Sequence, residues 1–389
     1  MNIIYVSNLI SESKMNKIIE KANKKPLQSI QKFHRLLCKG FIANNIKVKT
    51  ISAIPMSRKI SNKTIWLDKK EKEDGICYHY VPFINYKGIR QICIALATAF
   101  LITKEIIFGK KKKVFVCDIL DTTISYITLL LSKIFKYTCI GIATDLPENM
   151  SNATKLSHFL ENDCDAYVLL TEQMNDKINL KNKPFIVMEG LVDSNMQLLS
   201  NTLNNKYTKK VCIYAGGIYE KYGVKLLVDA FKNLNIKDAE LHLYGTGDLE
   251  KYLASIKNNK IKYYGVVENK KIVEEEIKAT LLINPRFTKE EYTKYSFPSK
   301  NMEYMVSGTP ILTTKLPGMP NEYIPYVYLF ENETLEGYQK SLEQILKKPQ
   351  QELFEKGKEA KEFMLKNKNN KKQASRIIYF INNTVTKEK

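Results

Sequence analysis

The sequence has few of the residues that build metal centres and disulfide frameworks. Only four His occur among its 389 residues, and its seven Cys form no C-x-x-C pair. An odd number of scattered Cys, several of them inside apolar runs such as VFVCD, indicates buried thiols in a reducing compartment. A His-rich metal site and a disulfide-stapled fold are therefore not expected.

Long hydrophobic runs and an excess of acidic residues are also missing. The longest apolar run, at residues 92–102, is shorter than the roughly 20 residues that span a bilayer. The N-terminal MNIIYVSNLI has no basic segment before its apolar residues, so it predicts a first strand and not a signal peptide. The net charge of +20 indicates an anionic partner: nucleic acid, a phosphate-bearing ligand or an acidic membrane surface.

The length and the hydrophobic pattern together predict two α/β domains. A chain of 389 residues exceeds one ordinary core. Short β-rich runs alternate with helical patterns in both halves, which is typical of parallel sheets covered by helices. In the first half the predicted strands are 2–6, 46–51, 113–118, 138–144, 166–170 and 184–189.

A polar stretch at residues 193–210 interrupts this rhythm and predicts a linker. The domains are then expected at 1–192 and 208–368, each with a doubly wound, Rossmann-like sheet. Ligands of such sheets bind outside the carboxyl ends of the strands. The sequence therefore predicts a binding site in the cleft between the two domains.

Two glycine-containing turns follow predicted strands of the second half. In YAGGIYEKYG, Gly216 and Gly217 would let backbone amides approach a diphosphate, with Lys221 nearby. An ordinary tight turn explains the same residues. In YGTGDLEKYL the third glycine of a dinucleotide fingerprint is missing, and Asp248 is expected near the start of the next helix. We interpret this second turn as structural.

The stretch YSFPSKNMEYMVSGTP predicts a short helix with well-defined ends. Pro298 suits the start of a helix, and Gly308 suits the position just after its end. The amides of the first turn, with Lys300, can hold a phosphate, and Glu303 can accept hydrogen bonds from sugar hydroxyls. The alternative is a helix whose Glu faces solvent only.

With these motifs in order, the C-terminal half resembles the nucleotide-binding domain of GT-B glycosyltransferases. It is most similar to the large retaining group, family 4-like or group 1, that includes bacterial mannosyl- and glucosyltransferases. The resemblance rests on YAGG with GVKLLVDAF, LHLYGTG, YYGVV, LLINPR, FPSKNMEYMVSGTPIL and GMPNEY. It implies two Rossmann-like domains that face an interdomain cleft. It also implies that a C-terminal helix at about 370–389 packs back on the N-terminal, acceptor-binding domain.

The resemblance also assigns roles to residues of the second half. Glu303 takes the place of the Glu that holds the donor's ribose, whereas Tyr295 stands where the family usually has a second Glu. Gly217 occupies the position of an Arg at the diphosphate, and Lys221 can serve for the nearby Lys. The donor site predicted in this way consists of Gly216, Gly217, Lys221, Arg286, Tyr295, Ser299, Lys300 and Glu303.

In the first half, Asp145 stands where the family often has a His that faces the donor sugar. We predict that it is catalytic, orienting the acceptor hydroxyl or stabilising positive charge on the anomeric carbon. Alternatively, it caps the turn before Pro147. The DxD at 163–165 precedes a predicted strand, so we expect Asp165 to mark the strand start and not a metal site. No metal or other cofactor is expected, because cations and helix N-termini can stabilise a leaving diphosphate.

The activity implied is transfer of a sugar from a nucleoside-diphosphate sugar to an acceptor hydroxyl, with retention. The resemblance further implies a bacterial enzyme that acts on a lipid-linked glycan in surface or capsular polysaccharide assembly. The alternative is a catalytically inactive homologue that acts as a partner or scaffold, as the residues at 217 and 295 suggest. A nicotinamide oxidoreductase is disfavoured, since YVSNLISES lacks glycine.

The basic residues predict a cytoplasmic protein at the inner face of an anionic membrane. They gather at 21–26, 87–90 and 109–113, and the helix expected at 91–109 has a broad apolar face that ends at the last of these clusters. That helix can either dock on lipid or lie buried in the α/β layers. Nucleic acid is not expected as a partner, because no recognition helix, RNA-stacking motif or zinc module is present.

Overall fold

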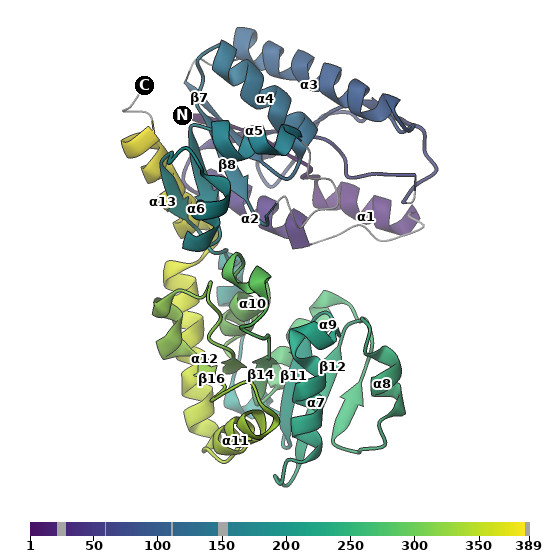
Figure 1. Cartoon of the computed structure of the whole chain (residues 1–389), viewed down its shortest axis with the longest axis vertical. Helices are drawn as coiled ribbons and strands as arrows, with labels where there is room; N and C mark the ends of the chain where they lie inside the picture. The colour runs from purple at the N-terminus through teal and green to yellow at the C-terminus, as the bar shows by residue number, and fades with distance from the viewer. Residues whose placement is uncertain (22–28, 59, 110–111, 147–154, 386–389) are drawn as a thin grey trace. The chain divides into compact units, whose positions relative to one another are not determined.

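The computed structural model describes residues 1–21, 29–58, 60–109, 112–146 and 155–385 (Figure 1). The chain divides into two compact units. Unit 1 comprises Met1–Leu191 and Asn370–Lys389, and unit 2 comprises Val192–Asn369. The C-terminal segment therefore belongs with the first half of the chain.

Unit 1 is built on a mainly parallel sheet in the order β10-β9-β8-β7-β1-β2-β5-β4, in which only β4 pairs antiparallel among the described residues. The six strands predicted in this half are all present. The two strands that follow β2 in this order, β5 and β4, were not predicted, because they are short and contain polar residues. The strands are β1 (Asn2–Ser7), β2 (Lys47–Ser52), β4 (Glu71–Glu73), β5 (Ile76–Tyr80), β7 (Lys113–Asp118), β8 (Cys139–Ala143), β9 (Ala166–Leu169) and β10 (Phe185–Val187), with a separate hairpin of β3 (Ile65–Trp66) and β6 (Phe83–Ile84).

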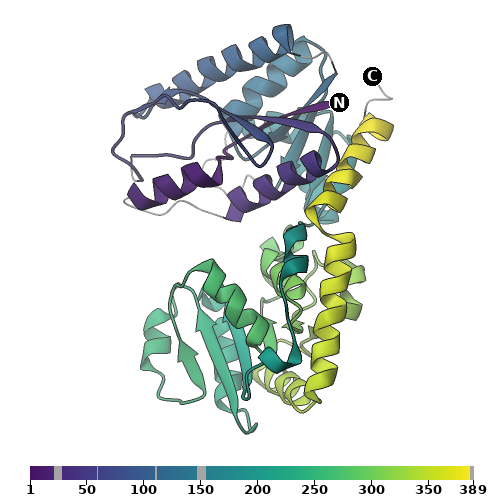
Figure 2. The ribbon, with the colours of Figure 1, turned by 180° about the vertical axis from the view of Figure 1, so that it is seen from behind.

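Helices cover the sheet of unit 1, and the last of them comes from the C-terminus (Figures 1 and 2). This helix, α13, packs on α2. The Nδ2 atom of Asn370 donates to the carbonyl oxygen of Leu36 at 3.3 Å. A Cβ placed at Gly40 would lie 2.1 Å from the carbonyl oxygen of Asn370, so the two helices touch where α2 has no side chain. The helices are α1 (Glu12–Lys21), α2 (Ser29–Ala43), α3 (Ile89–Phe108), α4 (Thr122–Ile134), α5 (Lys155–Asp163), α6 (Glu172–Ile178) and α13 (Asn370–Phe380).

Unit 2 has a fully parallel sheet in the order β13-β12-β11-β14-β15-β16. Its central strands are buried at every residue except Lys210, as their apolar sequences predict. The strands are β11 (Lys210–Ala215), β12 (Ala239–Tyr244), β13 (Ile261–Tyr263), β14 (Leu281–Asn284), β15 (Ile311–Thr313) and β16 (Tyr328–Leu329). The helices are α7 (Val224–Lys232), α8 (Glu250–Ser255), α9 (Asn269–Lys278), α10 (Ser299–Ser307), α11 (Leu335–Leu346) and α12 (Gln350–Asn367).

The polar stretch predicted as a linker is bonded to unit 2. The Nδ2 atom of Asn201 donates to the carbonyl oxygen of Ser307 at 2.9 Å. The ammonium group of Lys206 donates to the carbonyl oxygens of Ile277 and Ala279 at 2.7 and 3.0 Å. Polar side chains here satisfy backbone groups of neighbouring elements, which is why the stretch shows no apolar period.

Candidate donor site

The predicted donor residues lie at one edge of the sheet in unit 2. Ala215 of β11 pairs with Tyr244 of β12, and Asn284 of β14 pairs with Thr313 of β15. Because the strands are parallel, the loops that follow them leave the sheet at the same edge. This carboxyl edge carries the loops that contain Gly216, Arg286 and the start of α10.

Two glycines allow these loops to touch. Gly223 has a φ of 77°, and a Cβ placed there would lie 1.8 Å from the carbonyl oxygen of Pro285. Gly245 has a φ of 132°, and its Cβ would lie 1.8 Å from the carbonyl oxygen of Gly216. Side chains at these positions would force the loops apart. The loop after β11 therefore contacts the loops after β12 and β14 directly.

Asp248 also joins these loops, although not in the way that the sequence predicts. Its Oδ1 atom accepts a hydrogen bond from the backbone nitrogen of Glu220 at 3.2 Å. The helix α8 begins at Glu250, with Leu249 before it. The carboxylate thus supports the loop after β11 instead of capping its own helix.

An aromatic side chain holds two cations at this edge. The guanidinium carbon of Arg286 lies 4.5 Å from the ring centroid of Tyr222, and the ammonium nitrogen of Lys221 lies 5.4 Å from it. The ring centroid of Tyr292 lies 5.9 Å from the same guanidinium carbon. These cation–π contacts orient Arg286, whose Nε atom is enclosed and has no hydrogen-bond partner among the described residues. Tyr222 was not predicted as a site residue, although it lies within the quoted motif.

Buried polar contacts fix α10 against the ends of two strands. The hydroxyl of Tyr304 accepts a hydrogen bond from the backbone nitrogen of Ala215 at 2.7 Å. The Nδ2 atom of Asn284 donates to Oδ1 of Asn301 at 2.6 Å. All four residues are buried. Neither side chain of α10 was predicted as functional, because spacing alone cannot show which of its polar groups point inward.

The first turn of α10 has the ends that the sequence predicts. Pro298 precedes the helix with a φ of −62°, and Gly308 ends it in the left-handed region with a φ of 82°. Ser299, the first helical residue, is exposed. The amides of a first helical turn have no intrahelical acceptor and carry partial positive charge. They can therefore hold an anion at this edge of the sheet.

Lys300 and Glu303 form an ion pair on α10. Their Nζ and Oε2 atoms are 2.7 Å apart, and the two side chains are 28% and 27% exposed. Burial lowers the pKa of Lys300, but the charges of Glu303 and Glu276 outweigh it, so the pKa lies above its ordinary value. The ammonium group can bind a phosphate, and the carboxylate beside it can accept a hydrogen bond from a sugar hydroxyl.

The two positions that depart from the family pattern have local explanations. A Cβ placed at Gly217 would lie 2.7 Å from ring atoms of Tyr219, so an Arg there would displace that ring. The carbonyl oxygen of Gly217 accepts a hydrogen bond from the hydroxyl of Tyr214 at 2.7 Å. Tyr295 lies partly buried after the short helix Glu291–Lys294, and its backbone nitrogen donates to the carbonyl oxygen of Tyr292.

Asp145 belongs to unit 1, where it follows β8 at the carboxyl edge of that sheet. Its Oδ1 atom accepts a hydrogen bond from the backbone nitrogen of Leu146 at 2.8 Å. Pro147, which the capping alternative invokes, lies outside the described residues. Asp121 follows the neighbouring strand β7, and its Oδ1 accepts from Nδ2 of Asn8 at 3.4 Å. The carboxyl edge of unit 1 therefore gathers carboxylate and amide groups.

Beneath that edge lies a buried chain of polar groups that was not predicted. The hydroxyl of Tyr5 lies 2.6 Å from Nδ1 of His34, and Nε2 of His34 lies 2.9 Å from Oδ2 of Asp118. These side chains are at most 1% exposed. Three mutually satisfied polar groups in a core fix the relative positions of β1, α2 and β7.

The DxD carboxylates have structural partners. Asp163 is paired with Lys133 and Lys181 at 3.0 and 2.8 Å. Asp165 accepts a hydrogen bond from the backbone nitrogen of Cys139 at 2.8 Å, at the start of a strand as predicted. Within the described ranges, no three His, Cys, Asp or Glu side chains are grouped so as to hold a metal ion.

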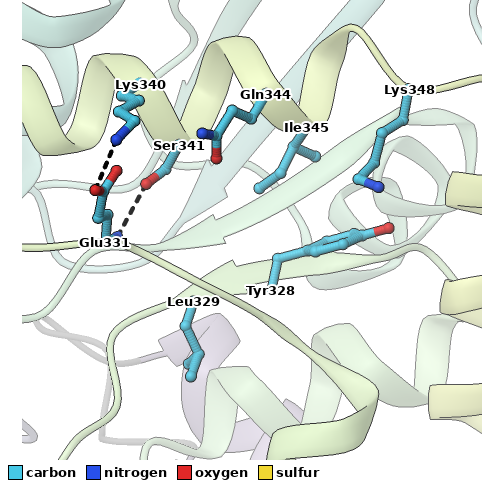
Figure 3. Close-up of a pocket in the computed structure, with 8 residues that line it drawn as sticks. All are labelled: Tyr328, Leu329, Glu331, Lys340, Ser341, Gln344, Ile345 and Lys348. Atoms are coloured by element: carbon cyan, nitrogen blue, oxygen red, sulfur yellow. Dashed lines mark hydrogen bonds and ion pairs between the residues drawn. The ribbon is translucent and has the colours of Figure 1, made fainter.

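A surface pocket of unit 2 lies apart from these residues. It has a volume of about 270 Å³ and is located between β16 and α11 (Figure 3). Glu331 in its wall pairs with Lys340 at 2.7 Å and donates its backbone N–H to the Oγ of Ser341. None of the predicted donor residues lines this pocket, so its chemistry does not contribute to the donor site. Its lining consists of Tyr328, Leu329, Glu331, Lys340, Ser341, Gln344, Ile345 and Lys348.

Comparison with known proteins gives one family match and many similar structures. Residues 196–363 match the family described as glycosyl transferases group 1. No curated protein sequence matches the chain significantly. Sucrose-phosphate synthase from Thermosynechococcus elongatus is 11% identical with a TM-score of 0.68, and covers 98% of each chain. HepE from Anabaena, in complex with UDP and glucose, is 10% identical with a TM-score of 0.63, and covers 98% of this chain and 100% of its own.

The lipopolysaccharide outer core galactosyltransferase WaaB is another similar structure. It is 14% identical with a TM-score of 0.63, and the match covers 100% of both chains. At such identities the structures establish the fold, and the family match establishes the class of the second unit. The predicted resemblance to group 1 glycosyltransferases is confirmed for residues 196–363, and the predicted GT-B fold class is confirmed.

Proposed function

We propose that this chain, whose residues 196–363 form a group 1 glycosyltransferase domain, transfers a sugar from a nucleoside-diphosphate sugar to a hydroxyl of a lipid-linked glycan. The reaction proceeds with retention and serves the assembly of a bacterial surface or capsular polysaccharide. One observation carries the donor half of this proposal. The carboxyl edge of unit 2 holds Arg286 on Tyr222, beside the Gly216–Gly217 turn and the first turn of α10.

In this proposal the cations of the edge bind the diphosphate. Arg286, Lys221 and Lys300, with the first-turn amides at Ser299, stabilise the charge that develops as the diphosphate leaves. No metal ion is needed for this step. Glu303 accepts hydrogen bonds from the ribose hydroxyls, and its ion pair with Lys300 at 2.7 Å orients it.

Asp145 acts on the acceptor half of the reaction in this proposal. Its carboxylate accepts a hydrogen bond from the acceptor hydroxyl, or stabilises positive charge on the anomeric carbon. The similarity to a lipopolysaccharide galactosyltransferase supports a glycan acceptor. The net charge of +20 supports a location at the cytoplasmic face of an anionic membrane.

The second candidate function is that of an inactive homologue that binds partners. It is favoured by Gly217 and Tyr295, which replace two polar family positions. The crowding of Gly217 by Tyr219 is compatible with either function, because Arg286 can supply the missing charge. Turnover of a bound donor separates the two candidates.

The first experiment is a thermal-shift screen against UDP, GDP, ADP, CMP and dTDP with their common sugars. A ligand at 100 times its Kd adds about 2.7 kcal/mol of stability. We expect one nucleotide to raise the melting temperature, and Arg286→Gln to abolish the shift. Lys340→Gln is the matched control, since Lys340 is an exposed cation of the same unit.

The outcomes of the screen separate the candidates. A shift followed by release of nucleoside diphosphate from the sugar nucleotide, even through slow hydrolysis, supports the transferase. A shift without any turnover of donor, with glycolipid acceptors and anionic vesicles present, supports the binding homologue. A shift that persists in Arg286→Gln removes Arg286 from the donor site.

A further inference from the structure

The helix α3 of unit 1 has an exposed face made of large apolar side chains. Ile92, Leu96 and Phe100 lie four residues apart, which places them on one face of the helix, and they are 60%, 69% and 67% exposed. Ile107 and Phe108 near its end are 60% and 80% exposed. We call these five residues the outer face of α3.

The opposite face of α3 is packed within unit 1. Ile94, Thr98, Ile102 and Ile106 are buried there. Gln91 accepts a hydrogen bond from the hydroxyl of Thr123 at 2.8 Å, which ties α3 to the start of α4. Figure 1 shows α3 as the outermost helix of unit 1, beside α4. The helix is therefore neither wholly buried nor wholly free.

The apolar surface extends beyond α3. Ile134 and Phe135 at the end of the adjacent α4 are 61% and 44% exposed. At the other end, β6 contacts α3, and Ile84 and Tyr86 are 39% and 58% exposed. Gathered exposed apolar side chains of this kind are typical of sites that bind a protein or a membrane.

The helix is long and apolar enough to cross a membrane by length and composition, because it extends past the apolar run at 92–102 in both directions. Its packing excludes that arrangement. The chain continues from α3 into β7, whose residues are buried in the middle of the sheet. To cross a membrane, α3 would also have to separate its buried face from α4. The geometry fits a helix that lies along a membrane surface with one face in lipid.

The charges around the outer face identify the kind of membrane. Lys133 at the end of α4 is paired with Asp163, and Arg90 interacts with Asp121, so the exposed cations beside this face are Lys87, Lys104 and Lys136. The one acidic residue of α3 is Glu105. That carboxylate forms an ion pair with Lys49 of β2 and is only 16% exposed. Lys residues beside an apolar helix face are complementary to anionic lipid headgroups.

A second copy of the chain fits this face less well. Pairing two such faces would bring the same cations together in a protein whose net charge is already +20. Like charges brought together in this way oppose association. The apolar stripe alone permits either occupant, and the charges favour the lipid surface.

We infer that the outer face of α3 docks unit 1 on an anionic lipid bilayer, with Ile92, Leu96, Phe100, Ile107 and Phe108 inserted below the headgroups. This surface deepens the proposed function and rests on it for its purpose, since docking would place the chain where a lipid-linked acceptor lies. The binding itself requires neither donor nor catalysis. Failure of docking and failure of transfer are therefore separate results.

The test is sedimentation of the full chain with vesicles of phosphatidylglycerol and phosphatidylcholine, compared with vesicles of phosphatidylcholine alone. We expect binding to the mixed vesicles and at least about tenfold weaker binding to the neutral ones. Leu96→Gln with Phe100→Gln should weaken binding to the mixed vesicles at least tenfold, because two apolar side chains no longer enter the lipid. The thermal melt of this double variant should match that of the original chain, since both side chains are exposed.

The matched control is Leu198→Gln with Val266→Gln. These apolar side chains are 79% and 70% exposed in unit 2, so the control makes the same kind of change elsewhere. Unchanged vesicle binding by Leu96→Gln with Phe100→Gln would overturn the inference. So would equal loss in the control, or a dimer in light scattering that dissociates in the α3 variant.

Discussion

The two units share one folding plan but present different chemistry at the carboxyl edges of their sheets. In unit 2 the edge gathers cations and aromatic rings, as in the contact of Arg286 with Tyr222 at 4.5 Å. In unit 1 the corresponding edge gathers Asp121, Asp145 and Asn8, with the buried pair of His34 and Asp118 beneath. The parallel sheet fixes where a site lies, and the loops determine which charge it presents.

In the proposed function, this difference assigns the donor to unit 2 and the acceptor to unit 1. Cations suit a diphosphate leaving group, whereas carboxylates and amides suit sugar hydroxyls. The family match covers residues 196–363, which lie in the cationic unit. A donor site is restricted by the constant diphosphate, but an acceptor site varies with the acceptor. Substitutions at each edge should therefore affect different measured quantities.

The largest effect is expected where the loops of unit 2 touch. Gly223→Ala should lower the free energy of unfolding of unit 2 by about 3 kcal/mol, because its new Cβ meets the carbonyl oxygen of Pro285 at 1.8 Å in a left-handed backbone. Urea denaturation followed by circular dichroism measures the change. The same variant should lose the nucleotide-induced thermal shift.

The control for this variant is Gly265→Ala in the same unit. Gly265 has a φ of 66°, but a Cβ there has no atom within 4 Å. Gly265→Ala should lower the free energy of unfolding by only about 1–2 kcal/mol, which is the cost of a left-handed backbone at a residue with a Cβ. Equal destabilisation by the two variants would show that the contact between the loops is unimportant.

At the edge of unit 1, Asp145→Asn should lower the rate of transfer about 100-fold and leave nucleotide affinity unchanged. The amide keeps the shape of the carboxylate but removes its charge, which corresponds to the usual contribution of a positioned acid–base or electrostatic group. Initial rates with donor and acceptor, beside a calorimetric titration of the nucleotide, give both quantities. Asp176→Asn, an exposed position on α6, is the control. A normal transfer rate would remove Asp145 from the reaction.

At the edge of unit 2, Glu303→Gln should weaken nucleotide binding about tenfold, because hydrogen bonds to a charged carboxylate contribute about 1.5–3 kcal/mol. Calorimetric titration of the nucleotide measures the affinity. Glu352→Gln is the control, since Glu352 lies on helix α12 of unit 2 and is also paired with a Lys. If both variants bind equally well, Glu303 does not contact the donor.

The sequence predicts unit 2 well because each of its signals is local. The short helix between Pro298 and Gly308 depends on an N-terminal Pro and a C-terminal Gly, which act within a few residues. The buried strands on either side follow from uninterrupted apolar runs. Local patterns of this kind are therefore sufficient to place Lys221, Lys300 and Glu303 at one edge of the sheet.

Other site features depend on contacts between distant residues, and no local pattern encodes them. The bond between Tyr304 and Ala215 joins residues 89 positions apart, and the bond between His34 and Asp118 joins residues 84 apart. The role of Tyr222 depends on the loop after β14, which Gly223 allows to approach. The exposure of the outer face of α3 depends on which face α4 covers, and the same apolar residues suit a buried helix equally well.

The smallest expected effect concerns Asp121, at the carboxyl edge of unit 1. Burial and the neighbouring charge of Asp118 raise the pKa of Asp121 well above its ordinary value, although hydrogen bonds to Asn8 and the charge of Arg90 oppose this. Its Oδ2 atom is enclosed without a hydrogen-bond partner among the described residues. The folded state therefore binds a proton at Asp121 more tightly than the unfolded state, and stability from this group is present at low pH and lost as pH rises through the raised pKa.

The amide of Asp121→Asn cannot ionise, so this variant should raise the free energy of unfolding by about 1 kcal/mol at pH 8. The gain should disappear as the pH falls to the ordinary pKa of a carboxyl group. Thermal melts at several pH values, with Asp176→Asn as the control, measure this dependence. A gain that is the same at every pH would mean that packing and not charge is responsible. A loss of stability at pH 8 would mean that Arg90 stabilises the charged carboxylate of Asp121. Asp121 would then be held in an ion pair and would not be open to a sugar hydroxyl.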